Sequence, residues 1–106
     1  MQKMSLVFFT APSHEVSRTI IHELVENGLI ACGTIIPQCT SIYRWQEHVE
    51  EHTESQSILK VAANLCDHVV ARIHDMHPYD VPEIIVMPVS GGLPAYINWV
   101  VGTPSA

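Results

Sequence analysis

The sequence predicts an α+β fold in which strands and helices follow the order β-α-β-β-α-β. Two stretches carry apolar residues at helical spacing, and four others are rich in β-forming residues. Proline, glycine or polar residues separate these stretches. At 106 residues the chain has the length of one domain, so a single domain over residues 1–106 is predicted.

The first strand and the first helix are predicted from adjoining segments. Met4–Thr10 is short, apolar and rich in β-forming residues, which is typical of a buried strand. Pro12 and Ser13 indicate the start of a helix with Ser13 as its N-cap, and Gly28 is placed to end it. The apolar stripe of this helix consists of Val16, Ile20, Ile21, Leu24 and Val25.

The second and third strands are predicted to form a long hairpin. Ala31–Ile36 and Thr40–Trp45 are both strand-like, and Pro37 between them indicates one long strand with a bend. The polar, acidic segment Gln46–Glu54 is expected to turn the chain, and Ser55–Ala62 to form the third strand. Strands that follow one another in the sequence usually pair, so these two are expected to be neighbours.

A second helix, a fourth strand and a short last helix complete the pattern. Asn64 is expected to cap the second helix, and Pro78 to stop it at about Met76. Its apolar stripe consists of Leu65, Val69, Val70 and Ile73. The fourth strand is predicted at Glu83–Val89. A short uncharged C-terminal helix is predicted at Ala95–Val101, opened by Pro94 at its first position.

This order is the ferredoxin-like pattern, an antiparallel four-stranded sheet with both long helices on one face. The other face then has no helix of its own, and self-association would cover it. Charged residues make up 15% of the chain, against about 25% in an ordinary soluble domain, which fits a surface partly covered by copies of itself.

Composition argues against several other classes. Acidic residues outnumber lysine and arginine by 11 to 5, and the net charge of −6 makes nucleic acid an unexpected partner. No apolar run approaches the roughly 18 residues of a membrane span, so no membrane partner is expected. Three cysteines without a CxxC pair favour a reducing compartment, and the cytoplasm is predicted.

Several segments together resemble a known family. They are Thr10-Ala11-Pro12, Ala31-Cys32, Thr40–Trp45, the apolar strand that ends at Lys60, and the run HPYDVPEI at His77–Ile84. In this order and spacing they resemble the CutA divalent-cation tolerance proteins, from about Leu6 to Trp99. The resemblance implies a ferredoxin-like homotrimer, cytoplasmic in bacteria, linked to copper and other divalent ions and not an enzyme.

The chain departs from the family pattern at its metal ligands and at two helix or turn positions. Some bacterial members are associated with a copper site made of a cysteine at the end of the first strand and two adjacent histidines. The matching positions here are Phe9, Met76 and His77. The hairpin turn carries Glu47 in place of the usual glycine, and Leu93 replaces the usual polar cap of the last helix.

A weak copper site is therefore the expectation for this region, with no cofactor required. Met76 offers a thioether and His77 an imidazole, and both suit copper. His74 lies three residues before His77, on the same side of the predicted helix. The alternative is that these are exposed histidines which interact with the helix dipole when charged.

A second candidate site follows from the resemblance, which groups Tyr43, Trp45, Lys60, Tyr79 and Glu83 around a cleft between subunits. Lys60 on an apolar strand is costly to bury unless it is paired, and Glu83 on another strand could pair with it. One interpretation is a small anion or metabolite held by Lys60 and the aromatic rings. The other is an interface ion pair with aromatic packing.

The remaining histidines and the cysteines are given structural roles. His48 and His52 lie roughly 13 Å apart in an extended strand, so they are not expected to share an ion and are interpreted as solvated turn residues. Cys32, Cys39 and Cys66 are expected to pack in the core.

Two other functions fit the same fold. One is a small-molecule sensor of the PII type, with a ligand cleft between the subunits of a trimer, although the sequence offers no long exposed effector loop. The other is an enzyme of the acylphosphatase type. That chemistry needs an arginine in the loop after the first strand, and residues 10–14 contain none. Fold alone does not decide between them.

Overall fold

The computed structural model describes residues 3–102. Four strands form one sheet in the spatial order β2-β3-β1-β4, with all neighbours antiparallel. The strands are β1 (Met4–Ala11), β2 (Cys32–Trp45), β3 (His48–Ala62) and β4 (Ile84–Pro88). The helices are α1 (His14–Glu26), α2 (Cys66–Met76) and α3 (Pro94–Val101), with a 3-10 turn at Ala63–Leu65. The predicted single domain also includes residues 1–2 and 103–106, which lie outside the described part.

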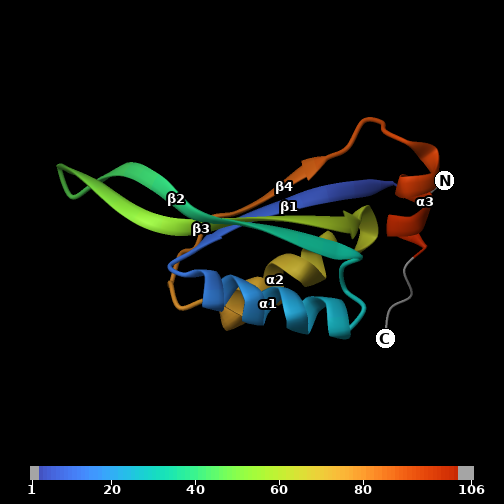
Figure 1. Cartoon of the computed structure of the whole chain (residues 1–106), viewed down its shortest axis with the longest axis horizontal. Helices are drawn as coiled ribbons and strands as arrows, with labels where there is room; N and C mark the ends of the chain where they lie inside the picture. Colours follow the sequence, from blue (N-terminus) through green and yellow to red (C-terminus); the bar gives the residue numbers. More distant parts are fainter. Residues whose placement is uncertain (1–2, 103–106) are drawn as a thin grey trace.

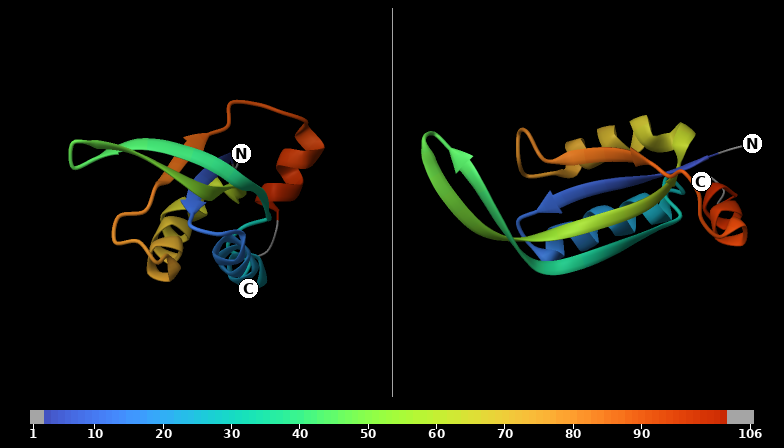
Figure 2. Two further views of the ribbon diagram at one scale, coloured as in Figure 1. Left: turned by 60° about the vertical axis from the view of Figure 1, so that its left-hand side comes forward. Right: turned by 90° about the horizontal axis from the view of Figure 1, so that it is seen from above.

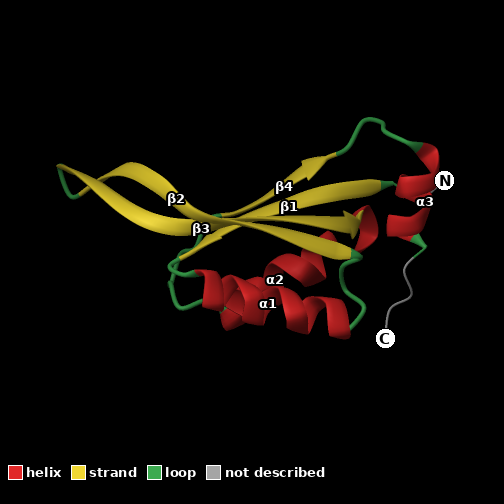
Figure 3. Cartoon of the chain, in the orientation of Figure 1, coloured by secondary structure: helices red, strands yellow, loops and turns green. Residues whose placement is uncertain are grey.

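The two long helices lie side by side on one face of the sheet (Figure 1). Arg72 of α2 pairs with Glu23 of α1. The short helix α3 lies at one end of the sheet, beside the start of β1 (Figure 3). Within residues 3–102 neither long helix covers the opposite face, and α3 contacts it at one end, where Cys32 of β2 meets Tyr96. This arrangement confirms the predicted ferredoxin-like α+β fold.

The hydrophobic core lies between the sheet and the two long helices. β1 and β3 alternate side chains between the faces, so that the inward set is fully buried. The largest members of the core are Phe9, Ile20, Leu24, Ile30, Leu59 and Ile73. The sheet approaches α1 closely at Gly33, where an added Cβ would lie 3.0 Å from Cγ2 of Ile21.

The predicted ends of α1 are confirmed. Ser13 is the N-cap, and its Oγ accepts a hydrogen bond of 3.2 Å from the backbone N–H of Val16. Gly28 follows the helix with φ of 69°, a conformation that glycine adopts without steric cost. The predicted cap of α2 is wrong, because Asn64 lies inside the 3-10 turn and Leu65 precedes the helix.

The hairpin is longer than predicted, because its turn contains only Gln46 and Glu47. Both residues have positive φ, 47° and 71°, as a tight two-residue hairpin turn requires. The prediction of a turn over Gln46–Glu54 is wrong, since His48 already pairs with Trp45. The backbone of residues 48–54 pairs with β2, but the side chains cover no hydrophobic core. The segment therefore lacks the alternation of apolar and polar residues that would have indicated a strand.

The predicted bend in β2 is confirmed. The register of the β2–β3 pair shifts between Ile36 and Cys39, and Gln38 has a φ of 57°. Beyond this bulge the two strands project past the ends of β1 and β4 as a ribbon (Figure 2). We call residues 38–54 the hairpin arm, and the rest of the described chain the body.

The last strand is shorter than predicted, and the last helix begins where predicted. β4 has only five residues, so Glu83 and Val89 lie outside it rather than at its ends. α3 opens at Pro94 as predicted, since the missing N–H of proline is tolerated in the first turn. Leu93 precedes the helix and makes no side-chain cap.

Candidate functional site

His77 links the end of β1 to the loop that leads into β4. The ring is 8% exposed, and its Nε2 lies 2.6 Å from the carbonyl oxygen of Thr10. Its Nδ1 accepts a hydrogen bond of 3.1 Å from the backbone N–H of Tyr79. Because Nδ1 accepts a hydrogen bond, the ring proton is on Nε2, and this N–H donates a hydrogen bond to the carbonyl oxygen of Thr10. The exposed, dipole-stabilised histidine considered from the sequence is therefore wrong for His77.

The packing around His77 also explains why Phe9 stands where the family pattern has a cysteine. The Phe9 ring is fully buried and meets the imidazole edge to face, with ring centroids 6.4 Å apart. The ring of Tyr79 lies on another side, at 4.8 Å. An apolar wall and two backbone hydrogen bonds hold the imidazole in place and leave it no free lone pair.

The other two predicted copper ligands lie nearby but do not complete a site. His74 is exposed, and its Nε2 is hydrogen-bonded to the carbonyl oxygen of Asp80 at 2.9 Å. Met76 is half-buried against the hydrophobic core. Across residues 3–102 there is no group of three or more His, Cys, Asp or Glu side chains that could hold a metal. His74, Met76 and His77 therefore do not fit a pre-formed copper centre.

Two of the predicted cleft residues, Tyr43 and Tyr79, come together at the root of the hairpin arm. Tyr79 Oη donates a hydrogen bond of 3.1 Å to Oε2 of Glu54. Burial, and next the Glu54 carboxylate, raise the pKa of the Tyr79 phenol, to which the nearby Tyr43 also contributes. Tyr43 Oη lies 3.0 Å from Nδ1 of His52, and the two rings pack edge to face.

The sequence reasoning missed Glu54 as a partner and placed His52 in a turn. The signal that could have found them is the alternation of Glu50, His52 and Glu54 in the sequence. Residues two apart in a strand point to the same face, so these three side chains share one side of β3. His48 and His52 are both strand residues, not turn residues.

The other three cleft residues lie apart within the chain. Lys60 Nζ donates a hydrogen bond of 2.7 Å to Oγ1 of Thr34. Lys60 is opposite Leu6, whereas Glu83 comes just before Ile84, which is opposite Phe9. The predicted Lys60–Glu83 pair does not form within residues 3–102 of one chain. Trp45 lies at the tip of the hairpin arm, away from both.

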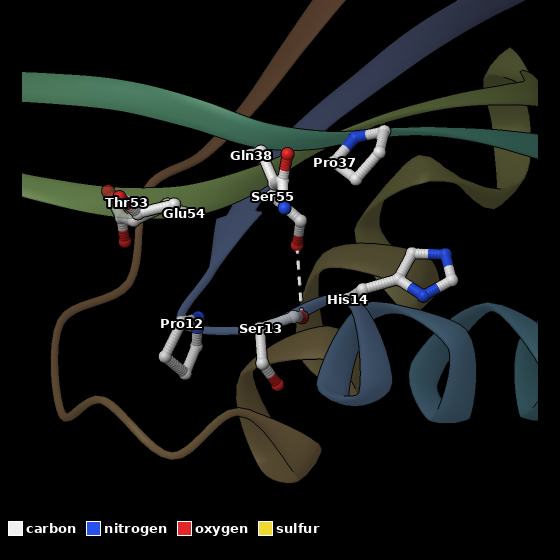
Figure 4. Close-up of a pocket in the computed structure, with 8 residues that line it drawn as sticks. All are labelled: Pro12, Ser13, His14, Pro37, Gln38, Thr53, Glu54 and Ser55. Carbon is white, nitrogen blue, oxygen red and sulfur yellow. Dashed lines mark hydrogen bonds between the residues drawn. The ribbon is translucent and has the colours of Figure 1, made fainter.

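An open groove of about 560 Å³ lies between the root of the hairpin arm and the start of α1 (Figure 4). Its walls are Pro12, Ser13, His14, Pro37, Gln38, Thr53, Glu54 and Ser55. The Ser55 hydroxyl donates to the carbonyl oxygen of Ser13 at 3.1 Å and is bonded to the buried Ser17 hydroxyl. These contacts fasten β3 to the first turn of α1. Glu54 is the only carboxylate among the lining residues.

The cysteines occupy two kinds of surroundings. Cys66 is buried in the core as predicted, and burial raises the pKa of its thiol. Cys32 and Cys39 are only half-buried, so their predicted core packing is wrong. Both lie on β2, the outer strand of the sheet, which pairs with another strand on one side only. Cys32 Sγ is 3.4 Å from Oη of Tyr96 on α3.

None of the helices in residues 3–102 has the length and apolar character needed to cross a membrane.

The sequence has clear relatives. Residues 5–103 match the family model described as "CutA1 divalent ion tolerance protein". The chain is 43% identical over 94 residues to the Divalent-cation tolerance protein CutA of Thermus thermophilus, which covers 89% of this chain and 91% of that relative. It is 38% identical over 97 residues to Protein CutA of Mus musculus, covering 92% of this chain but only 55% of the mouse protein.

The fold agrees with the sequence relatives. The crystal structure of divalent ion tolerance protein CutA1 from Ehrlichia chaffeensis superimposes with a TM-score of 0.93 at 36% identity. That match covers 97% of this chain and 96% of the other. Family model, sequence identity and backbone geometry thus agree over nearly the whole length, and the chain belongs to the CutA1 divalent ion tolerance protein family.

Proposed function

We propose that the protein acts as a cytoplasmic homotrimer in the tolerance of divalent cations, without catalysing a reaction. The observation that carries the proposal is the uncovered face of the sheet. The cytoplasmic assignment is supported by three free cysteines, which are typical of a reducing compartment. The role in cation tolerance is supported by membership of the family.

The uncovered face carries a group of apolar side chains. The pairing registers place its side chains in rows across β3, β1 and β4. Its apolar members are Leu6, Phe8, Ile58, Ile85 and Met87, with Ile36 on β2. Ile85 is 51% exposed and Met87 50% exposed in the single chain. Apolar area is stabilised by roughly 25 cal/mol for each Å² removed from water, so this face favours a covering partner.

The hairpin arm needs a partner for a second reason. An isolated two-stranded ribbon is only marginally stable in water. Ile42, Trp45 and Val49 on the arm are 65%, 60% and 68% exposed. In a closed ring of three copies each arm packs against a neighbour, and the outer strands β2 and β4 are no longer open edges.

The proposed trimer would also bring the predicted cleft residues, which are separated within one chain, together at the contact between subunits. Lys60 lies on the uncovered face and Glu83 directly before β4, with no ion pair between the two within residues 3–102. We place Lys60 of one copy near Glu83 of the next, with Tyr43, Trp45 and Tyr79 packed around the pair. Such a pairing offsets the cost of covering a lysine with apolar surface.

The copper ligands suggested by the sequence do not enter this proposal. His77 would have to give up two backbone hydrogen bonds before it could bind a metal. A divalent cation would therefore have to bind at residues other than His74, Met76 and His77.

The test is the mass in solution, measured by light scattering at micromolar concentration. The native chain is expected at about three times its 11.8 kDa mass. Ile85→Glu places a charge in the proposed interface and should give monomers that remain folded by circular dichroism. The matched control is Val81→Glu, at a fully exposed position outside the sheet, which should remain trimeric. A monomeric native chain would refute the proposal.

A further inference from the structure

A histidine and a carboxylate lie close together on one face of the hairpin arm. Nε2 of His52 is 3.6 Å from Oε2 of Glu50, and the two side chains are 51% and 41% exposed. They are two residues apart on β3, so both point to the same side of the ribbon. This pair is outside the groove lining and separate from His74, Met76 and His77.

The tyrosine on the neighbouring strand fixes the imidazole. Tyr43 is directly opposite Glu50 in the register, and its Oη lies 3.0 Å from Nδ1 of His52. When Nδ1–H donates to this oxygen, the lone pair of Nε2 is directed toward the carboxylate. Two acceptors that face each other in this way require a proton or a cation between them.

The spacing suits a metal ion. Ligand nitrogen and oxygen atoms lie about 2.0–2.2 Å from zinc, so two of them in a tetrahedral arrangement are roughly 3.4 Å apart. The observed 3.6 Å therefore requires only a small adjustment. A hydrogen bond from the second ring nitrogen, as to Tyr43 here, is the usual companion of a metal-bound histidine.

The electrostatic surroundings favour a cation. Glu54 lies two residues beyond His52 on the same face, and the chain carries a net charge of −6. The nearest basic residues in sequence are Arg44 and Lys60. Arg44 pairs with Val49, and so lies on the opposite face of the ribbon.

We propose that His52 and Glu50 bind a divalent transition-metal ion such as Zn²⁺, with water at the remaining positions. This deepens the proposed function and rests on it, since it gives a cation-tolerance protein a place where the cation binds. With only two protein ligands the site is weak and accessible, so it fills when the ion is in excess. The hairpin arm then carries both the cation site and the contacts to a neighbouring copy.

The experiment is calorimetric titration of the full chain with Zn²⁺, which is redox-inert toward the free thiols. His52→Gln is expected to weaken zinc binding about tenfold or more, and Glu50→Gln severalfold. The matched control is His48→Gln, on the same strand and face but in no ion pair with a carboxylate of residues 3–102, which should change affinity less than about twofold. Cys39→Ser should likewise bind as the native chain does.

Two outcomes would overturn the site. One is that His52→Gln binds zinc as tightly as the native chain. The other is that His48→Gln or Cys39→Ser loses affinity equally, which would place the ion elsewhere. Light scattering on the same samples separates this result from the proposed assembly. A trimer without zinc binding at His52 removes the site alone, whereas a monomer that binds zinc removes the assembly alone.

Discussion

The body and the hairpin arm bury their apolar side chains in different ways. In the body, Val7, Phe9 and Leu59 have no exposed surface, because the helices of the same chain cover them. In the arm, Ile42 and Val49 are among the most exposed apolar residues of the described chain. The body therefore contains its own source of stability. The arm is regular because its backbone is paired, and it can bury side chains only against another molecule.

The strongest test of this difference is a cavity in the body. Phe9→Ala removes a fully buried ring and should cost about 3–5 kcal/mol, a large part of the 5–15 kcal/mol typical of a domain. Urea unfolding followed by circular dichroism measures this loss. A cost below about 1 kcal/mol would show that the core does not carry the stability of the body.

The next largest effect is expected at His77. His77→Ala leaves the N–H of Tyr79 and the carbonyl of Thr10 without their side-chain partner, at a cost of about 2 kcal/mol. His74→Ala is the control, since that side chain is exposed and should change unfolding by less than about 0.5 kcal/mol. If His77→Ala unfolds like the native protein, the ring is not the structural link described above.

Tyr79 joins the body to the arm, and its contribution is expected to depend on pH. Its phenol pKa is raised above the ordinary 10.0, so the stability it adds is complete below pH 10 and is lost as pH rises through the higher folded value. Tyr79→Phe should remove the hydrogen bond to Glu54, at a cost of about 1 kcal/mol.

The measurement is the difference in unfolding free energy between the native chain and Tyr79→Phe, taken from neutral to alkaline pH. The difference should be constant up to about pH 9 and shrink above about pH 10. If the difference in unfolding free energy between the two proteins stays constant over the whole pH range, the raised pKa of Tyr79 is contradicted.

A gain in stability is expected at the tip of the arm. Glu47 has a φ of 71°, and glycine adopts this conformation without the steric cost that a side chain adds. Glu47→Gly should therefore stabilise the hairpin by up to about 1 kcal/mol. The melting temperature of the two proteins at equal concentration measures it, and a clear decrease would contradict the turn geometry.

The smallest effect on folding is expected for the exposed side chains of the arm. Val49→Ser should change the unfolding of the body by less than about 0.5 kcal/mol, because Val49 contacts water in the single chain. It should nevertheless weaken the proposed assembly, which the dependence of mass on concentration would reveal. A large loss of monomer stability would show that the arm supports the body.

Sequence periodicity predicted the body well and the arm poorly, for one physical reason. The apolar residues of α1 and α2 recur at helical spacing because these helices pack against the sheet of the same chain. Residues 46–54 are regular strand and turn without a covering partner in the chain, so their alternation is polar and was interpreted as a long turn.

The candidate site was predictable only in part. The resemblance groups Tyr43 and Tyr79 around a cleft between subunits, but the hydrogen bonds of Tyr79 to Glu54 and of Tyr43 to His52 depend on the strand register. The approach of Thr10 to His77 is a contact between residues 67 positions apart, which no local pattern reveals. His77, beside Met76 at the end of a helix, was therefore interpreted as a metal ligand, although in the structure its ring is hydrogen-bonded to backbone atoms of Thr10 and Tyr79.

The bulge in β2 limits how copies of this chain can join. Pro37 offers no N–H, and Gln38 turns the backbone out of register midway along an outer strand. At the other edge, β4 has five residues and ends at Pro88. Neither edge can template a long, uninterrupted ladder, so chain-to-chain pairing cannot continue indefinitely. A protein with an exposed apolar ribbon is thereby protected from growing into fibres.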